Sequence, residues 1–200
     1  MFVKVCGLDS VANARVALES GADAIGVVMS PRSPRHLEFG TAAEILAAVR
    51  DDVETVLVVR EMPATEAAEA AARLGADVLQ LHGGRYARED FARALEVFPR
   101  LWRATSLTAD PDLRVGAWGE ERLLLDAPRA GSGERWDLSA LTTRRPEGEW
   151  LLAGGLAPGN VAEAIASARP WGVDVSSGVE SGPGVKDPEL IRAFVAAARA

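Results

Sequence analysis

The 200-residue sequence predicts an α/β fold: a single (β/α)8 barrel in which residues 1–200 form one catalytic domain. Short runs rich in Val, Ile and Leu alternate with amphipathic stretches along the whole chain, and about eight of each are present. No linker-like segment divides them. The alternative is an open doubly wound sheet, but the turn after the first run, Cys6-Gly-Leu-Asp9, lacks the G-x-G-x-x-G pattern of dinucleotide-binding sheets. The barrel is therefore favoured.

The apolar runs are bounded by Gly, Pro or charged residues, as is typical of parallel strands that are covered on both faces. The predicted strands are Phe2–Gly7, Ala24–Met29, Glu54–Val59, Asp77–Leu81, Leu101–Thr105, Arg122–Asp126, Trp150–Ala153 and Gly172–Val175.

Apolar residues at helical spacing predict the helices between these strands. Ser10 is the expected N-cap of the first helix, Thr41 and Glu44 form an expected capping box, and Gly21 and Gly75 follow helix ends. The fifth connection, Thr108–Gly119, is weakly patterned, and the sixth, Trp136–Thr143, is short. The predicted helices are Ser10–Glu19, Ala42–Arg50, Thr65–Leu74, Arg88–Val97, Val161–Ala168 and Pro188–Ala198.

Composition restricts the class of protein. The formal net charge of −7 argues against a nucleic-acid partner that is bound through its backbone. No apolar run reaches the roughly 20 residues that cross a bilayer, and the N-terminus lacks the pattern of a signal peptide. The one cysteine, Cys6, cannot form an internal disulfide. We therefore expect a cytoplasmic protein without a membrane partner, either a monomer or a homodimer.

Alternate side chains of a barrel strand point inward, and barrel enzymes place their chemistry at the C-terminal ends of the strands. Cys6 and Asp126 are the last inward positions of the first and sixth strands. A thiolate in this place can remove a carbon-bound proton, and a carboxyl can act as the acid. The alternatives are a small buried cysteine and an aspartate that caps a helix or pairs with an arginine. We predict Cys6 and Asp126 as the catalytic pair.

Glycine turns follow the seventh and eighth strands, where barrels of this kind commonly hold phosphate. Gly154 and Gly155 form the first turn, and Ser177 and Gly178 lie in the second. Glycines allow backbone N–H groups to approach a ligand closely. The alternative is a pair of tight connections without a ligand. Phosphate is favoured, so a small phosphorylated substrate is the expected partner.

Other polar residues lie near the same end of the barrel. Arg35, in a loop stiffened by two prolines, is a candidate for binding a substrate carboxylate, with Arg32 as its competitor. We expect His82 to line the pocket without a catalytic role, and no spacing of ligand residues predicts a metal site. A buried lysine needs a partner, so Lys4 is expected to pair with Asp174. Gly131-Ser-Gly133 is either a lid hinge or a loose loop.

Taken together, these segments resemble the phosphoribosylanthranilate isomerase family along the whole chain. The segments that carry the resemblance are Lys4-Val-Cys-Gly7, Gly21-Ala-Asp-Ala-Ile-Gly26, Ser33-Pro-Arg35, Gln80-Leu-His-Gly83, Leu124-Leu-Asp126, Gly131-Ser-Gly133, Leu152-Ala-Gly-Gly-Leu156 with Asn160-Val161, Asp174-Val-Ser-Ser-Gly-Val-Glu180 and Pro183-Gly-Val-Lys-Asp187.

The resemblance implies an Amadori rearrangement of N-(5′-phosphoribosyl)anthranilate to 1-(2-carboxyphenylamino)-1-deoxyribulose 5-phosphate in tryptophan biosynthesis, without a cofactor. It also implies roles for single residues. Asp126 would open the ribose as the acid, Cys6 would take the C2′ proton, and Arg35 would bind the anthranilate carboxylate.

The sequence departs from the family pattern in three places. Arg60 and Glu61 stand after the third strand where the family shows a Phe-Val-Asn-like ending, Met29 replaces an expected aromatic residue, and the loop after the sixth strand is altered. The departures affect substrate range. Two other functions remain open: a related histidine-pathway isomerase of broader range, which Cys6 argues against because that relative uses two aspartates, and a non-catalytic barrel that binds a phosphorylated ligand.

Overall fold

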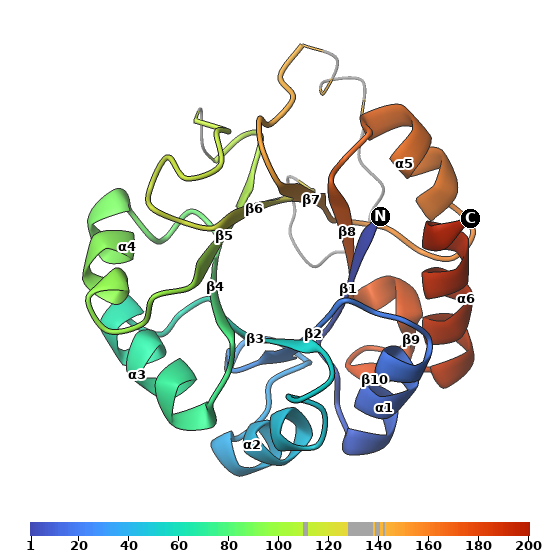
Figure 1. Cartoon of the computed structure of the whole chain (residues 1–200), viewed down its shortest axis with the longest axis horizontal. Helices are drawn as coiled ribbons and strands as arrows, with labels where there is room; N and C mark the ends of the chain where they lie inside the picture. Colours follow the sequence, from blue (N-terminus) through green and yellow to red (C-terminus); the bar gives the residue numbers. More distant parts are fainter. Residues whose placement is uncertain (110–111, 128–137, 139–140, 142) are drawn as a thin grey trace.

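A computed structural model describes residues 1–109, 112–127, 138, 141 and 143–200. Its centre is a closed barrel of parallel strands in the order β1 to β8, with helices arranged around it (Figure 1). The predicted fold class is therefore confirmed. The strands are β1 (Phe2–Cys6), β2 (Ala24–Val28), β3 (Glu54–Val59), β4 (Val78–His82), β5 (Leu101–Ser106), β6 (Arg122–Asp126), β7 (Trp150–Leu152) and β8 (Gly172–Val175).

The predicted strand ends differ from the observed ones by one residue at most. β4 and β5 continue through His82 and Ser106 because these residues still pair with neighbouring strands, His82 opposite Ala104 and Ser106 opposite Asp126. β1 stops before Gly7, whose φ of +70° breaks the extended backbone. Polar side chains at the strand ends therefore belong to the sheet, which holds them in fixed positions.

The helices outside the barrel follow the predicted spacing. Ser10 caps the first one, since its hydroxyl oxygen accepts the Asn13 N–H at 3.2 Å. Gly21 and Gly75 follow helix ends with φ of +92° and +64°. The helices are α1 (Val11–Glu19), α2 (Phe39–Ala47), α3 (Ala64–Leu74), α4 (Arg88–Leu95), α5 (Val161–Ala168) and α6 (Pro188–Arg199).

The predicted start of α2 is wrong, and so is its capping box. The helix begins at Phe39, which places Thr41 and Glu44 inside it, and the N-cap Glu38 makes no side-chain bond. His36 bridges to Val28, and the Leu37 N–H donates to the Val28 carbonyl. These contacts hold the preceding chain against β2, so the helix can begin directly after them. In the fifth connection, the described part of residues 108–119 forms no helix.

Apolar residues pack in two shells. Between strands and helices lies the larger cluster, to which the strands contribute residues such as Val5, Ile25 and Leu79. Inside the barrel, the alternate residues form a second cluster that includes Val56, Val58 and Trp102 together with Cys6, Val28, Leu124, Leu151 and Ala153. The alternation places Cys6 on the inner face, as predicted. Among the described helices, none combines the length and the apolar character that would let it cross a membrane.

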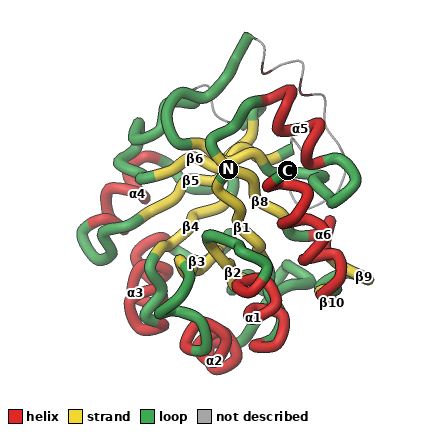
Figure 2. Tube along the Cα trace, turned by 45° about the vertical axis from the view of Figure 1, so that its right-hand side comes forward, coloured by secondary structure: helices red, strands yellow, loops and turns green. Residues whose placement is uncertain are grey.

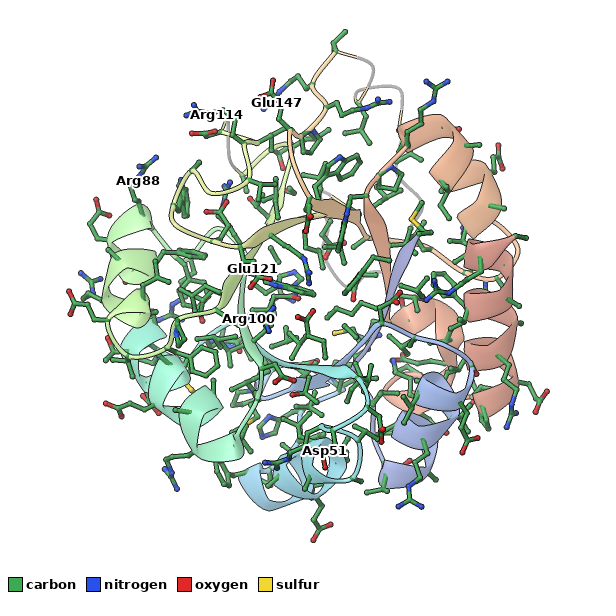
Figure 3. The ribbon with its side chains drawn as sticks, in the orientation of Figure 1. Asp51, Arg88, Arg100, Arg114, Glu121 and Glu147 are labelled. Carbon is green, nitrogen blue, oxygen red and sulfur yellow. The ribbon has the colours of Figure 1, made fainter. Side chains whose placement is uncertain are left out.

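The N-terminal end of the barrel is closed by aromatic and charged side chains. The guanidinium of Arg122 lies 4.7, 4.9 and 4.6 Å from the ring centres of Phe2, Trp102 and Trp171. Arg122 and Arg100 also bind Glu54, at 2.7 and 2.5 Å. Arg100 pairs with Glu121 at 2.8 Å, and Figure 3 shows these two side chains near one another. This arrangement leaves the C-terminal end as the open side.

The barrel closes where β1 pairs with β8, and an ion pair lies at this seam. The Lys4 Nζ lies 2.6 Å from the Asp174 Oδ1, and both side chains are buried. The predicted pairing is confirmed. Both views place α6 near α1 and the two chain ends close together (Figures 1 and 2). Arg199 at the end of α6 donates to the Met1 carbonyl at 3.1 Å, which ties the last helix to the first strand.

Candidate active site

A cavity opens at the C-terminal end of the barrel and encloses about 710 Å³, part of it continuous with solvent. The last inward residues of the strands line it. Cys6 of β1 and Asp126 of β6 both face this space, although they are 120 positions apart in the chain. The other lining residues are Val28, Ser33, Arg35, Val58, Arg60, Gln80, His82, Ala153, Gly154, Gly155, Leu156, Asp174, Val175, Ser176 and Ser177.

Cys6 lies on the cavity wall with 6% of its surface exposed. Gly26 on β2 leaves room beside it: a Cβ at that position would lie 3.0 Å from the Cys6 Sγ and 3.3 Å from the Lys4 Nζ. Burial raises the pKa of the Cys6 thiol, and the Lys4 ammonium partly opposes this shift. The same burial works against the charged form of Lys4, but Asp174 and Cys6 outweigh it and raise the pKa of Lys4. The Lys4 ammonium is therefore placed to stabilise the thiolate form of Cys6.

Asp126 is 6% exposed and is held at both of its oxygens. Oδ1 accepts the backbone N–H of Ala127 at 2.7 Å, and Oδ2 lies 3.3 Å from the Nε2 of His82. A Cβ on Gly154 would lie 2.8 Å from Oδ1, so the glycine in the turn after β7 gives the carboxylate its space. The carboxyl group is thus fixed in a defined orientation toward the cavity.

The contact between His82 and Asp126 was not predicted from the sequence. We expected His82 to line the pocket, and it does, but it also touches the candidate acid. Its Nδ1 lies 3.5 Å from the Nε2 of the buried Gln80 on the same strand. Strand β5 lies between β4, which carries His82, and β6, which carries Asp126. It presents the small Ala104 and Ser106, which allow residues of β4 and β6 to approach one another. That spacing of small inward residues is the sequence signal for the contact.

The turn after β7 has the geometry of an anion cradle. Gly154 and Gly155 adopt φ of +86° and +65°. Asn160 supports the turn: its Nδ2 donates to the Gly155 carbonyl at 2.8 Å, while its Oδ1 accepts the Ala157 N–H at 2.8 Å. These two contacts hold the backbone of the turn in place, and its glycines leave room for an anion to approach the main chain. Gly154, Gly155 and Ser177 line the cavity, as their predicted role requires.

Gly178 lies where the loop after β8 packs against the loop after β7. A Cβ there would meet the Leu156 carbonyl oxygen at 1.8 Å and the Ala157 Cα at 3.0 Å. The requirement for glycine is therefore one of close backbone approach between the two loops.

The Gly178→Ala variant is expected to push the two loops apart and to raise the KM for a phosphorylated substrate at least tenfold, about 1.4 kcal/mol of binding. Overpacking at a tight backbone contact should also lower the free energy of unfolding by about 1–3 kcal/mol. Steady-state kinetics and urea unfolding measure the two effects. Gly159→Ala is the control, since nothing lies within 4 Å of a Cβ there. Equal KM values in both variants would contradict the expectation.

Arg35 lines the cavity, whereas its competitor Arg32 is exposed. The Arg35 Nε and Nη2 donate to the two carboxylate oxygens of Glu180, at 2.6 and 2.9 Å. Burial works against the Glu180 carboxylate, but Arg35 and Lys186 outweigh it and hold its pKa below the usual range. Two of the five guanidinium N–H groups are thus engaged, and the rest remain available to a substrate.

The small hairpin that supports Arg35 was not predicted from the sequence. Strands β9 (Glu180–Gly182) and β10 (Val185–Lys186) pair antiparallel after a 3₁₀ turn, η2 (Ser177–Val179). The buried Lys186 binds Glu180 at 2.7 Å and the Ser176 carbonyl at 2.8 Å. Burial lowers the pKa of Lys186. The hairpin therefore links the turn after β8 to Arg35.

Two predicted features cannot be placed. The hinge at Gly131–Gly133 lies outside the described residues, and so does most of the sixth connection, Trp136–Thr143. Among the residues that the structure does describe, no group of three His, Cys, Asp or Glu side chains could hold a metal ion.

Comparisons with known proteins agree with this geometry. Residues 3–197 match the family model for N-(5′-phosphoribosyl)anthranilate isomerase. The chain is 44% identical to the isomerase of that name from Paracoccus denitrificans over 99% of this chain and 97% of the relative. TrpF from Jonesia denitrificans is 57% identical, with a TM-score of 0.92 over 100% of this chain and 97% of that one.

A further solved structure of the same kind of isomerase, 31% identical, has a TM-score of 0.86 over 100% of this chain and 98% of that one. It was determined in complex with reduced 1-(o-carboxyphenylamino)-1-deoxyribulose 5-phosphate.

Proposed function

The chain belongs to the N-(5′-phosphoribosyl)anthranilate isomerase family, and we propose that it performs this reaction with Asp126 as the acid and Cys6 as the base. The enzyme is an isomerase of tryptophan biosynthesis that converts N-(5′-phosphoribosyl)anthranilate to 1-(2-carboxyphenylamino)-1-deoxyribulose 5-phosphate. The observation that carries the proposed roles is the opening of Cys6 and Asp126 onto one cavity that the glycine turn after β7 also lines.

Asp126 performs the first proton transfer. It protonates the ring oxygen of the ribose while the lone pair of the substrate nitrogen forms a double bond to C1′, so the bond between C1′ and the ring oxygen breaks. The product is an open-chain protonated Schiff base. The two contacts of Asp126, with the Ala127 N–H and with His82, keep its carboxyl aimed at the cavity.

Cys6 performs the second transfer. Its thiolate takes the C2′ proton, and the electrons of the C–H bond move into a C1′–C2′ double bond as the nitrogen regains its lone pair. The resulting enolamine tautomerises to the ketone. Lys4 lies close enough to favour the thiolate, and its charge is balanced by Asp174 on the neighbouring strand.

The remaining residues bind and orient the substrate. The turns at Gly154–Gly155 and at Ser177 accept the phosphate, with Gly178 holding the second turn in place. Arg35 presents its free N–H groups to the substrate carboxylate, with Glu180 fixing its orientation. His82 lines the space next to the acid. We expect the reaction to need no cofactor and to take place in the cytoplasm.

The test is turnover of freshly generated phosphoribosylanthranilate, followed as the loss of its fluorescence. The purified chain is expected to consume it with a kcat/KM of roughly 10⁴ M⁻¹s⁻¹ or more. The histidine-pathway aminoimidazole substrate is assayed beside it and should react at least about a hundredfold more slowly, a difference of 2.7 kcal/mol. Binding without turnover would reject the isomerase and favour a non-catalytic barrel. Comparable rates on both substrates would indicate the broader enzyme.

A further inference from the structure

Arg60 stands at the mouth of the barrel on the side where the sequence departs from the family pattern. It follows the last residue of β3 and continues the inward alternation of Val56 and Val58. It lines the main cavity and also an adjoining pocket, which shares His82 and Asp126 with it. Beyond these residues, the adjoining pocket runs past Gly83, Gly84, Thr105, Ser106, Thr108, Ala109 and Ala127. Arg60 therefore borders both spaces.

Arg60 differs from the other cations near the cavity in its contacts. Arg35 and Lys186 share the Glu180 carboxylate, and Lys4 pairs with Asp174. Arg60, by contrast, forms no ion pair or hydrogen bond with any residue of the described part of the chain. Its neighbour Glu61 is turned to β2, where it accepts a hydrogen bond from the buried hydroxyl of Ser30. A guanidinium that lines a cavity without an ion-pair partner among the described residues can bind an anionic group there.

The arrangement of the strands indicates which anion this is. In the closed order β1 to β8, β3 lies across the barrel from β7, and Figure 1 shows the two on opposite sides of the ring. A substrate whose phosphate is held at the turn after β7 therefore extends its other end toward β3. In an N-(5′-phosphoribosyl)arylamine that other end is the aromatic ring, which carries the carboxylate in the anthranilate case.

We propose that Arg60 binds the ring carboxylate from the β3 side and makes the enzyme selective for arylamines that carry this group. The inference rests on the proposed function for the nature of the substrate. Arg35 also lines the cavity, but its guanidinium is bound to Glu180 in the hairpin after β8, so Arg60 is the arginine on the β3 side. Because two N–H groups of Arg35 are already bound to Glu180, Arg60 supplies a second guanidinium whose N–H groups are not engaged by the described residues.

The test removes the Arg60 charge from the protein and the ring carboxylate from the ligand, first one at a time and then together. The ligands are the reduced product, 1-(2-carboxyphenylamino)-1-deoxyribitol 5-phosphate, and the same compound without the ring carboxylate. Isothermal titration calorimetry measures their dissociation constants on the wild type and on Arg60→Met. The variant should bind the carboxylated ligand about 30-fold more weakly, as expected for the loss of a charge-assisted hydrogen bond. Binding of the other ligand should change less than about twofold.

Arg85→Met is the matched control, since Arg85 is exposed in the loop after β4 and lines neither space. It removes the same charge and should leave both dissociation constants unchanged. Arg60→Gln repeats the comparison with a polar side chain and should give the same ratio. Thermal unfolding of each variant verifies the fold.

An equal loss of affinity for both ligands in Arg60→Met would overturn the proposal, because the arginine would then act on the phosphate or on the fold. Unchanged affinity for both would overturn it as well. These outcomes are independent of catalysis. Tight binding of the carboxylated ligand by a chain that fails to turn over phosphoribosylanthranilate would reject the isomerase mechanism and leave the role of Arg60 standing.

Discussion

Replacing Cys6 by alanine is expected to lower kcat on phosphoribosylanthranilate by about 10³- to 10⁴-fold, the upper range for loss of a general base. The variant keeps the phosphate turns and Arg35, so the Kd for a reduced product analogue should change less than about threefold. Stopped-flow fluorescence measures the turnover, and calorimetry measures the binding. Cys6→Ser, which retains a hydroxyl of similar size, should be as slow, because a serine hydroxyl next to a lysine stays protonated.

A pH profile makes this prediction sharper. A base works only when it is deprotonated, so kcat/KM should rise with pH through the pKa of Cys6. Burial raises that pKa, and Lys4 opposes the shift only in part, so the rise should lie on the alkaline side of an ordinary thiol. Cys6→Ala should lose this limb of the profile. Activity within tenfold of the wild type, with the limb intact, would show that another group takes the proton.

Replacing Asp126 by asparagine is expected to reduce kcat by about 10²- to 10⁴-fold through loss of the general acid. The carboxamide keeps the shape of the side chain and can still accept the Ala127 N–H, but it has no acidic proton to give to the ring oxygen. The KM should stay within about threefold of the wild-type value, since the binding residues are untouched. Steady-state kinetics with a thermal unfolding control measures the change.

Two comparisons test whether the lower kcat of Asp126→Asn comes from the loss of the general acid. Asp51→Asn changes an exposed aspartate in the turn after α2, on the periphery of Figure 3, and should leave kcat unchanged. A substrate analogue that already has the open-chain form bypasses the acid step. Asp126→Asn should convert it at near the wild-type rate, whereas Cys6→Ala should not. Equal impairment of both variants on this analogue would contradict separate roles.

Most of the fold could be predicted because periodicity and burial agree along the chain. The strands Glu54–Val59, Arg122–Asp126 and Gly172–Val175 have the predicted bounds, since each is an apolar run with a sharp polar boundary. The start of α2 could not be predicted, because a tertiary bridge between Val28 and His36 decides it and Thr41 offers a stronger local cap signal. Propensity near a helix end is a weak preference that long-range contacts override.

The candidate site could be predicted only in part, because here too local signals are visible in the sequence and long-range contacts are not. Strand ends and inward alternation are local properties, and they pointed to Cys6, Asp126 and His82. The pairing of Arg35 with Glu180 joins residues 145 positions apart, and the contact of His82 with Asp126 depends on small residues of the intervening β5. Such contacts depend on which strands become neighbours and on how side chains of different size fill the barrel. Only the second leaves a trace in the sequence, the small Ala104 and Ser106 of β5.

The seam between β1 and β8 also has a consequence during synthesis. The ammonium of Lys4 and its carboxylate partner are separated by 170 residues, so most of the polypeptide must leave the ribosome before they meet. Until then, β1 presents an open edge, and a lysine that the finished molecule buries completely must stay hydrated. The nascent chain therefore completes its barrel late, and substitutions at this seam are expected to lower the yield of soluble protein in addition to their effect on the Cys6 thiolate.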